Sequence, residues 1–330
     1  MIWGLIGAST IAAQHMIAAI RANGGAIAWV VSGKADHAAS YAQTHDIPRH
    51  GTDLAAMLAD HSVAAVYISS TNDKHFAQSM AAIAAGKHVL CEKPLAMTLE
   101  QARQMVQAAA AAGLTFATNH HLRCAGSHHA IRDIIASGRI GRVLSARLFH
   151  AVHLPPALQG WRINDAGAGG GVIADICVHD ADACRFLLGQ NPVDVVATAV
   201  SSGMGTGVED SVMWTATMAS GAQVMAHASF THPFAGSGIE VHGSEGSIFA
   251  QGVMTQNPVG RVELVTARGR EVVAFAPHNL YEYGVGRFGD ATRGKGTPAA
   301  TGADGIASLQ VAEAVRQAAQ TGMRVRIEGI

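Results

Sequence analysis

Residues 4–12 read GLIGASTIA and overlap the end of a short β-prone run, residues 2–6. A glycine-rich turn between a first strand and a helix is the setting in which a dinucleotide fingerprint occurs. Gly7 would allow the tight turn and Ala12 a close helix–sheet contact, while Ser9 replaces the second glycine of the fingerprint. The free N–H groups at the start of the helix would bind a pyrophosphate. A glycine-rich turn without a ligand remains the alternative.

The residues around this turn alternate between strand-like and helix-like runs. We expect strands at residues 2–6, 26–32, 63–69 and 88–91, and helices at residues 10–22 and 76–85. Such alternation favours parallel βαβ units. The sequence therefore predicts an α/β protein whose residues 1–121 form an N-terminal Rossmann dinucleotide-binding domain.

The pattern changes after about residue 140. Successive β-rich runs, separated by short glycine-containing turns, read RVLSARLFHAVH (142–153), VDVVATAVSS (193–202), DSVMWTATMAS (210–220), AQVMAHASFTH (222–232) and IEVHG (239–243). They predict a large, mostly antiparallel sheet in a substrate-binding α/β domain, residues 122–330, with a helix at 306–320 and a short strand at 324–328. One face of such a sheet can stay open, so a homo-oligomer formed through that face is possible.

Composition excludes several classes of protein. The 330 residues are 49% hydrophobic and 14% charged, with a formal net charge of −1, which gives no electrostatic reason to bind nucleic acid or an anionic membrane. No window of 18 apolar residues suggests a membrane span. The apolar start has its first charge, Arg21, behind the apolar run rather than before it, unlike a signal peptide. We expect a cytoplasmic protein.

The four cysteines form no CxxC pair. They stand at Cys91, Cys124, Cys177 and Cys184. Scattered single cysteines are typical of small buried apolar residues in a reducing compartment.

The end of the second predicted strand bears on the choice of cofactor. An NAD site usually has an acidic residue there, whereas this chain has Ser32, Gly33 and Lys34, with His37 nearby. A carboxylate about 4 Å from a 2′-phosphate would cost roughly 4 kcal/mol at an effective dielectric constant near 20. The residues favour NADP. Asp36 leaves the opposite choice open, because a strand that ends a few residues later would place this acid at the ribose.

Residues 91–96, CEKPLA, follow the strand predicted at 88–91. Lys93 would stand at the carboxyl edge of the parallel sheet, where α/β proteins bind ligands. The proline after it fixes the chain and is compatible with a cis peptide bond. An exposed lysine that begins a loop is the alternative.

Residues 169–182, GGGVIADICVHDAD, place Asp175 and His179 four residues apart. On a helix the two side chains would share one face. A carboxylate beside an imidazole can fix its tautomer and raise its pKa, which suits proton transfer. A buried histidine paired with a helix acid, and a metal pair, are the alternatives. Metal has little support, because no third ligand has a convincing spacing, and we expect no metal.

Taken together, GLIGASTIA, STNDKH (70–75), GKHVLCEKPLA (86–96), NHHLR (119–123) and GGGVIADICVHDAD resemble the Gfo/Idh/MocA oxidoreductase family over essentially the whole chain. The resemblance implies NADPH-dependent reduction of a ketosugar by hydride transfer. Lys93 and His179 would meet the substrate carbonyl and assist its protonation, with Asp175 supporting His179. Either Lys93 or His179 could be the proton donor.

The resemblance also implies a set of residues around cofactor or substrate. They are Gly7, Ser9, Thr10, Ile11, Ala12, Ser32, Gly33, Lys34, His37, Ser70, Thr71, Asn72, His75, Glu92, Lys93, Asn119, Trp161, Arg162 and Tyr281. One departure lies at the 2′-phosphate, where related enzymes carry an arginine and this chain has His37. Another sugar or polyol dehydrogenase of the inositol type, and a non-catalytic dinucleotide-sensing regulator, are the alternative functions.

Overall fold

The computed structural model describes residues 1–329 and divides into two compact units. The first unit comprises Met1–His120 together with Tyr281–Ile306, and the second comprises His121–Leu280 together with the chain from Ala307 onward. The expected boundaries, 1–121 and 122–330, place residues 281–306 in the second domain. This segment groups with the first unit because Phe288 packs against Trp3, with ring centroids 5.2 Å apart, and Thr301 forms a β-bridge with Ala117.

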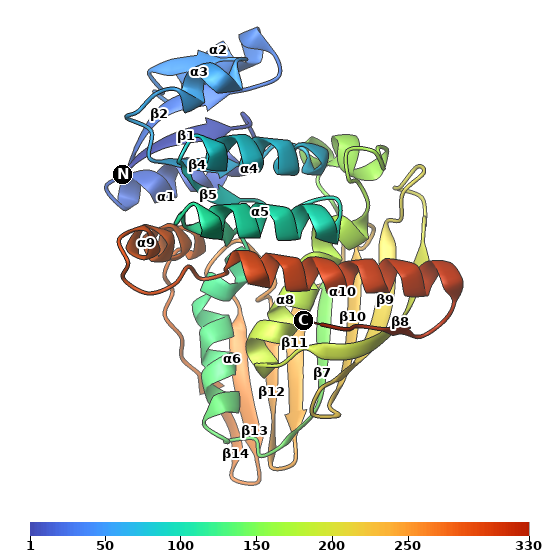
Figure 1. Cartoon of the computed structure of the whole chain (residues 1–330). Helices are drawn as coiled ribbons and strands as arrows, with labels where there is room; N and C mark the ends of the chain where they lie inside the picture. The colour runs from blue at the N-terminus through green and yellow to red at the C-terminus, as the bar shows by residue number, and fades with distance from the viewer. Residues whose placement is uncertain (330) are drawn as a thin grey trace. The chain divides into compact units, whose positions relative to one another are not determined.

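The first unit contains a six-stranded parallel sheet (Figure 1). Its strands, in spatial order, are β3 (Arg49–Gly51), β2 (Ala26–Val31), β1 (Ile2–Ile6), β4 (Ala65–Ile68), β5 (His88–Cys91) and β6 (Phe116–Thr118). The chain reverses its direction of winding between β1 and β4, which is the point where such sheets bind ligands. The predicted parallel βαβ organisation is confirmed.

Helices lie between these strands, and α9, which comes much later in the chain, follows β14. They are η1 (Ala12–Met16), α1 (Ile17–Ala22), α2 (Ala35–Thr44), α3 (Leu54–Leu58), η2 (Asn72–Lys74), α4 (His75–Ala84), α5 (Leu99–Ala111) and α9 (Leu280–Thr292). The helix predicted at 10–22 is present, but η1 has π-helical hydrogen bonding. The helix predicted at 76–85 is α4.

The second unit contains a nine-stranded sheet. In spatial order its strands are β14 (Gly269–Val273), β13 (Arg261–Thr266), β12 (Gly246–Gln251), β11 (Ser237–Gly243), β7 (Val143–Ala151), β10 (Gln223–Ser229), β9 (Ser211–Met218), β8 (Pro192–Val200) and β15 (Val325–Arg326). The predicted mostly antiparallel sheet is confirmed, with one exception. β10 and β7 are parallel neighbours, and the long connection between them contains helices and then the strands β8 and β9.

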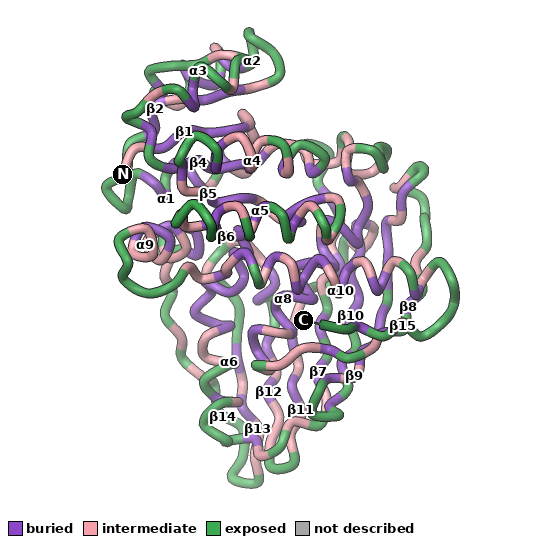
Figure 2. The backbone as a smooth tube through the Cα atoms, in the orientation of Figure 1, coloured by how far each residue is buried: buried purple, intermediate pink, exposed green. Residues whose placement is uncertain are grey.

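Helices cover one face of this second sheet. The second unit contains η3 (His121–Cys124), α6 (Gly126–Ala136), α7 (Pro156–Gln159), η4 (Gly160–Ile163), η5 (Ile173–Cys177) and α8 (Val178–Leu188), and its core also takes residues from α10 (Gly302–Thr321). On β9, Val212, Trp214 and Ala216 are buried, whereas Met213 and Thr215 are exposed. Figure 2 colours the backbone by this burial. Period-2 alternation of this kind places one face of a sheet in the core.

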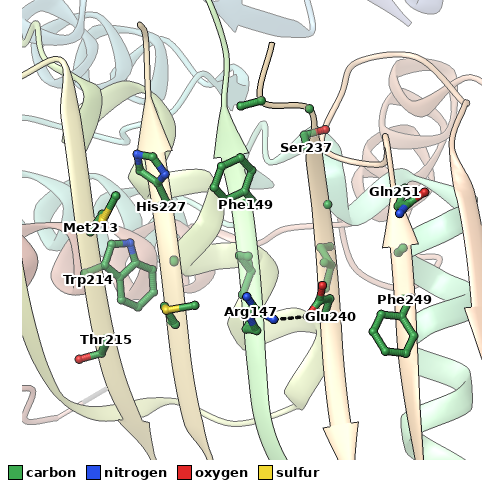
Figure 3. Close-up of a pocket in the computed structure, with 18 of the residues that line it drawn as sticks. Arg147, Phe149, Met213, Trp214, Thr215, His227, Ser237, Glu240, Phe249 and Gln251 are labelled. Atoms are coloured by element: carbon green, nitrogen blue, oxygen red, sulfur yellow. Dashed lines mark hydrogen bonds and ion pairs between the residues drawn. The ribbon is translucent and has the colours of Figure 1, made fainter. Parts of the chain in front are cut away.

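The opposite face of this sheet forms an apolar groove of about 960 Å³. Figure 3 shows Phe149, Met213 and Phe249 projecting into it, and Arg147 donating a 2.8 Å hydrogen bond to Glu240. Self-association through this face stays a prediction.

The structure also bears on the cysteines and on membrane-spanning helices. All four cysteines are buried and form no disulfide. Within residues 1–329, no helix is both long and apolar enough to cross a membrane.

Candidate active site

The turn after β1 requires glycine. Gly7 has a φ of +107°, and a Cβ there would lie 2.9 Å from both the Ser69 carbonyl carbon and the Ser70 nitrogen. The Gly7 N–H donates to the Val31 carbonyl at 2.8 Å. The turn thus lies against the residues that follow β4, at the switch point of the sheet. This close backbone approach is the feature that a pyrophosphate-binding turn needs.

Ser9 is held by several neighbours, and its carbonyl also accepts the Ala13 N–H at 3.1 Å. Its hydroxyl accepts the Ala12 N–H at 3.2 Å and lies 2.7 Å from the Ser69 hydroxyl, and its carbonyl accepts the Tyr41 hydroxyl at 2.9 Å. The hydroxyl therefore satisfies an N–H group at the helix start, as N-cap serines do. Sequence reasoning considered this hydroxyl for phosphate binding and did not identify Tyr41 or Ser69.

The residue directly after β2 is Ser32, because the strand ends at Val31. Its hydroxyl lies 3.2 Å from His37 Nδ1. Lys34 immediately precedes α2, and Asp36 lies in the first turn of that helix. The structure thus brings Ser32 and His37 together and puts no carboxylate at the end of the strand itself.

The loops after β4 and β5 are tied together by His75. This buried ring has Nδ1 2.9 Å from the Pro94 carbonyl and Nε2 3.3 Å from the Ser70 carbonyl. Burial lowers the pKa of His75, although the two carbonyls oppose that effect. Thr71 and Asn72 follow Ser70 at the start of η2.

Glu92 fixes the backbone beside Lys93. Its Oε1 accepts hydrogen bonds of 2.5 Å from both the Tyr67 hydroxyl and the Asn119 amide. Burial raises the pKa of Glu92, and these two donors together with Lys93 oppose the rise. The peptide bond between Lys93 and Pro94 is cis. Sequence reasoning grouped Glu92, Lys93 and Asn119 but did not identify Tyr67.

Tyr281 joins the first unit through the helix that follows the glycine-rich turn. Its ring stacks on His15 with centroids 4.5 Å apart, and the residue is only 1% exposed. His15 carried no signal in the sequence, because its partner is more than 260 positions away.

In the second unit the glycine run at 169–171 packs closely against other segments. A Cβ on Gly171, whose φ is +105°, would lie 2.5 Å from Glu209 Oε1, and one on Gly170 would lie 2.6 Å from the Trp161 carbonyl. Small residues are needed because the backbone runs directly against these groups. The run therefore places Trp161 and Arg162 beside the helix that carries Asp175 and His179.

Asp175 lies within η5, whose hydrogen bonding is π-helical, and α8 begins at Val178. The Asp175 carboxylate is 3.6 Å from Arg162 Nε. The His179 ring meets His121 edge to face, with centroids 4.7 Å apart, and lies 6.4 Å from the His150 ring. Sequence reasoning identified neither histidine neighbour. Support of His179 by Asp175 stays a prediction.

Two buried aspartates in the first half of α8 pair with residues from other segments. His150 Nδ1 lies 2.9 Å from Asp180 Oδ1, and burial raises the pKa of Asp180 while His150 opposes the rise. Asp182, 1% exposed, accepts from Arg123 Nε at 2.7 Å. These pairs fix the helix on which His179 stands.

The structure thus groups the predicted residues into local clusters. In the first unit these are the turn and its helix start, the Ser32–His37 pair and the Glu92–Asn119 pair; in the second they are Trp161, Arg162, Asp175 and His179. Lys93 belongs to the first unit and His179 to the second. Their joint action on one carbonyl stays a prediction.

Family models match both parts of the chain. Residues 1–120 match the model of the oxidoreductase family with an NAD-binding Rossmann fold, and residues 128–249 match the GFO/IDH/MocA C-terminal domain. The chain belongs to the Gfo/Idh/MocA oxidoreductase family. The fold and the family inferred from the sequence are confirmed.

Individual relatives span the full chain. The 1,5-anhydro-D-fructose reductase of Ensifer adhaerens is 53% identical over 99% of this chain and 98% of its own length. The D-xylose 1-dehydrogenase (NADP(+)) 2 of Haloferax volcanii is 28% identical over 99% of this chain and 100% of its own.

Solved structures of low sequence identity share the fold. The aldose-aldose oxidoreductase from Caulobacter crescentus, complexed with glycerol, has a TM-score of 0.91 at 24% identity and covers 99% of both chains. Levoglucosan dehydrogenase in complex with NADH and levoglucosan has a TM-score of 0.88 at 23% identity and covers 100% of both chains.

Proposed function

We propose that the protein reduces the C2 ketone of 1,5-anhydro-D-fructose with NADPH, which gives 1,5-anhydro-D-mannitol. The observation that carries this proposal is the 53% identity to 1,5-anhydro-D-fructose reductase over 99% of the chain. The presence of Lys93, Asp175 and His179 in their motifs supports a catalytic role over a non-catalytic sensor.

The residues of the first unit fit a dinucleotide. Gly7 lets the turn lie directly against the residues after β4, where a Cβ would clash, and the adjoining helix start offers N–H groups to a pyrophosphate. Ser32, Lys34 and His37 would hold the 2′-phosphate. Glu92 and Asn119 would lie beside the nicotinamide ring of the cofactor. When bound, NADPH supplies the hydride that reaches the substrate carbonyl carbon.

The protein then has to stabilise and protonate the carbonyl oxygen, which becomes an alkoxide as the carbon is reduced. The Lys93 ammonium polarises this oxygen as a compact positive charge. Lys93 or His179 supplies the proton. Asp175 keeps the His179 ring in the productive orientation.

Cofactor preference follows from the groups at the end of β2. We expect NADPH to bind more tightly than NADH, and Ser32→Asp to weaken NADPH binding at least about tenfold, since 1.4 kcal/mol already suffices. The reason is repulsion between the new carboxylate and the 2′-phosphate. Ser32→Asn is the matched control, because it has the shape of aspartate without the charge. Equal affinities for both cofactors, unchanged by Ser32→Asp, would contradict the NADP assignment.

The polar character of the proposed site narrows the substrate class. Its side chains are rich in hydrogen-bond donors, namely Lys93, Asn119, His120, Arg162, His179 and Tyr281, and Asp175 adds an acceptor. A buried donor left unpaired costs about 1–3 kcal/mol. A compact polyhydroxylated ligand can satisfy several such donors, whereas a steroid or a long aliphatic ketone would leave them unpaired.

The substrate is tested by comparing kcat/KM values. We expect 1,5-anhydro-D-fructose to be reduced most efficiently, other ketosugars more slowly, and acetone not at all. Myo-inositol and glucose, supplied with NADP⁺, test the oxidative alternative. If a cyclic polyol is oxidised more efficiently than 1,5-anhydro-D-fructose is reduced, the proposed substrate is wrong, while the family assignment still holds. Cofactor binding without turnover of any sugar would favour a dinucleotide-sensing regulator.

A further inference from the structure

Tyr41 on α2 contacts two different parts of the proposed cofactor site. Its hydroxyl donates to the Ser9 carbonyl at 2.9 Å, and its ring lies edge to face with His37, with centroids 6.2 Å apart and planes at 82°. The residue is 8% exposed. Burial also raises the pKa of the Tyr41 phenol, so the hydroxyl remains a donor across the working pH range.

The Tyr41 hydroxyl holds the glycine-rich turn that would bind the pyrophosphate. Ser9 stands between Gly7 and the helix start, and its own hydroxyl is already engaged by the Ala12 N–H and by Ser69. The Ser9 carbonyl accepts the Ala13 N–H at 3.1 Å within the helix start, and the Tyr41 hydroxyl adds a second hydrogen bond to it from α2. NADPH and NADH carry the same pyrophosphate, so this contact serves both cofactors equally.

The Tyr41 ring packs beside His37, on the side of the site that would bind the 2′-phosphate. His37 lies one helical turn before Tyr41, and its Nδ1 is engaged by the Ser32 hydroxyl at 3.2 Å. Within residues 1–329 no hydrogen-bond partner holds His37 Nε2, which is therefore the nitrogen that can meet a phosphate. Tyr41 restricts the exposed His37 ring from the helix side. NADH has no 2′-phosphate and gains nothing from this restriction.

We propose that Tyr41 is a positioning residue with two separable roles: its hydroxyl fixes the pyrophosphate turn for either cofactor, and its ring fixes His37 for NADPH alone. The second role rests on the proposed NADPH preference, and the first does not. Tyr41 thereby joins the part of the site that binds any dinucleotide to the part that discriminates between them.

Dissociation constants for NADPH and NADH, measured by fluorescence titration, separate the two roles. Tyr41→Phe keeps the ring and should weaken both cofactors by the same factor, about threefold to tenfold, as expected for one neutral hydrogen bond. Tyr41→Leu removes the ring as well, and should weaken NADPH by a further factor of about three or more without a further loss for NADH. If Tyr41→Leu no longer unfolds cooperatively on heating, Tyr41→Met replaces it as the variant without an aromatic ring.

His37→Ala provides the control background. In that background Tyr41→Leu should cause no NADPH-specific loss beyond that of Tyr41→Phe, because the ring has nothing left to position. The ring role is overturned if Tyr41→Leu and Tyr41→Met weaken both cofactors equally in the His37 protein. The hydroxyl role is overturned if Tyr41→Phe leaves NADH affinity unchanged. Equal affinity of the unaltered protein for the two cofactors would overturn the NADPH preference and the ring role with it, whereas the NADH titrations still test the hydroxyl.

Discussion

Lys93→Ala and His179→Ala are each expected to lower kcat for ketone reduction by about a hundredfold or more while NADPH still binds. Each change removes a group that the proposed mechanism needs only as negative charge develops on the substrate oxygen. An interaction made in the transition state lowers kcat when it is lost, whereas uniform binding changes KM. Steady-state kinetics with a parallel titration of NADPH separates these two effects.

Matched variants identify the proton donor. Lys93→Arg keeps the positive charge but carries a guanidinium that does not give up a proton at neutral pH. If Lys93 only polarises the oxygen, Lys93→Arg should retain more activity than Lys93→Ala; if it donates the proton, the two should be similarly impaired. Histidine is the side chain whose charge ordinarily changes between pH 5 and 8. A reduction rate that stays flat from pH 6 to 8 would therefore count against His179 as the donor.

Arg123→Met is expected to lower the free energy of unfolding by about 3–5 kcal/mol. Asp182 is almost fully buried and lies 2.7 Å from Arg123 Nε, while Arg185 Nη1 is 4.0 Å from the other carboxylate oxygen. Removing one partner of a buried ion pair leaves a desolvated charge that is poorly compensated. Urea denaturation at neutral pH measures the loss.

The double variant Arg123→Met with Asp182→Asn is the control for this prediction. Removing both charges eliminates the uncompensated carboxylate, so most of the lost stability should return. A double variant as unstable as Arg123→Met alone would contradict the electrostatic cause and point to packing around Phe186, against which the Arg123 guanidinium lies at 5.3 Å.

Sequence patterns located the strands, helices and site residues that depend on residues close together in the chain. The strand at 88–91 matches β5, because an apolar run bounded by Gly86 and Pro94 has few alternatives. Ser32 and His37 are neighbours in sequence, and the start of α2 brings them together. Glu92 directly follows β5, and its motif is recognised locally, whereas its contact with Asn119 spans 27 positions.

The remaining features depend on tertiary contacts that leave no local pattern. Nothing in residues 223–229 indicates that β10 pairs in parallel with β7. The π-helical segments at 12–16 and 173–177 look like ordinary helix in the sequence. Tyr41 could have been suspected only as a tyrosine one turn after His37, because its hydrogen bond reaches Ser9, 32 positions away.

The position of residues 281–306 in the first unit constrains the order in which that unit can form during synthesis. When a ribosome has made the first 280 residues, all six strands of the parallel sheet exist. Phe288, which packs on the buried Trp3, and Tyr281, which stacks on His15, have not yet been made. Although N-terminal domains generally fold first on the ribosome, this one reaches its complete form only after residues 281–306 have been translated. A fragment cut after residue 121 would leave Trp3 without its aromatic partner, whereas joining residues 281–306 to residues 1–120 through a short linker would restore it.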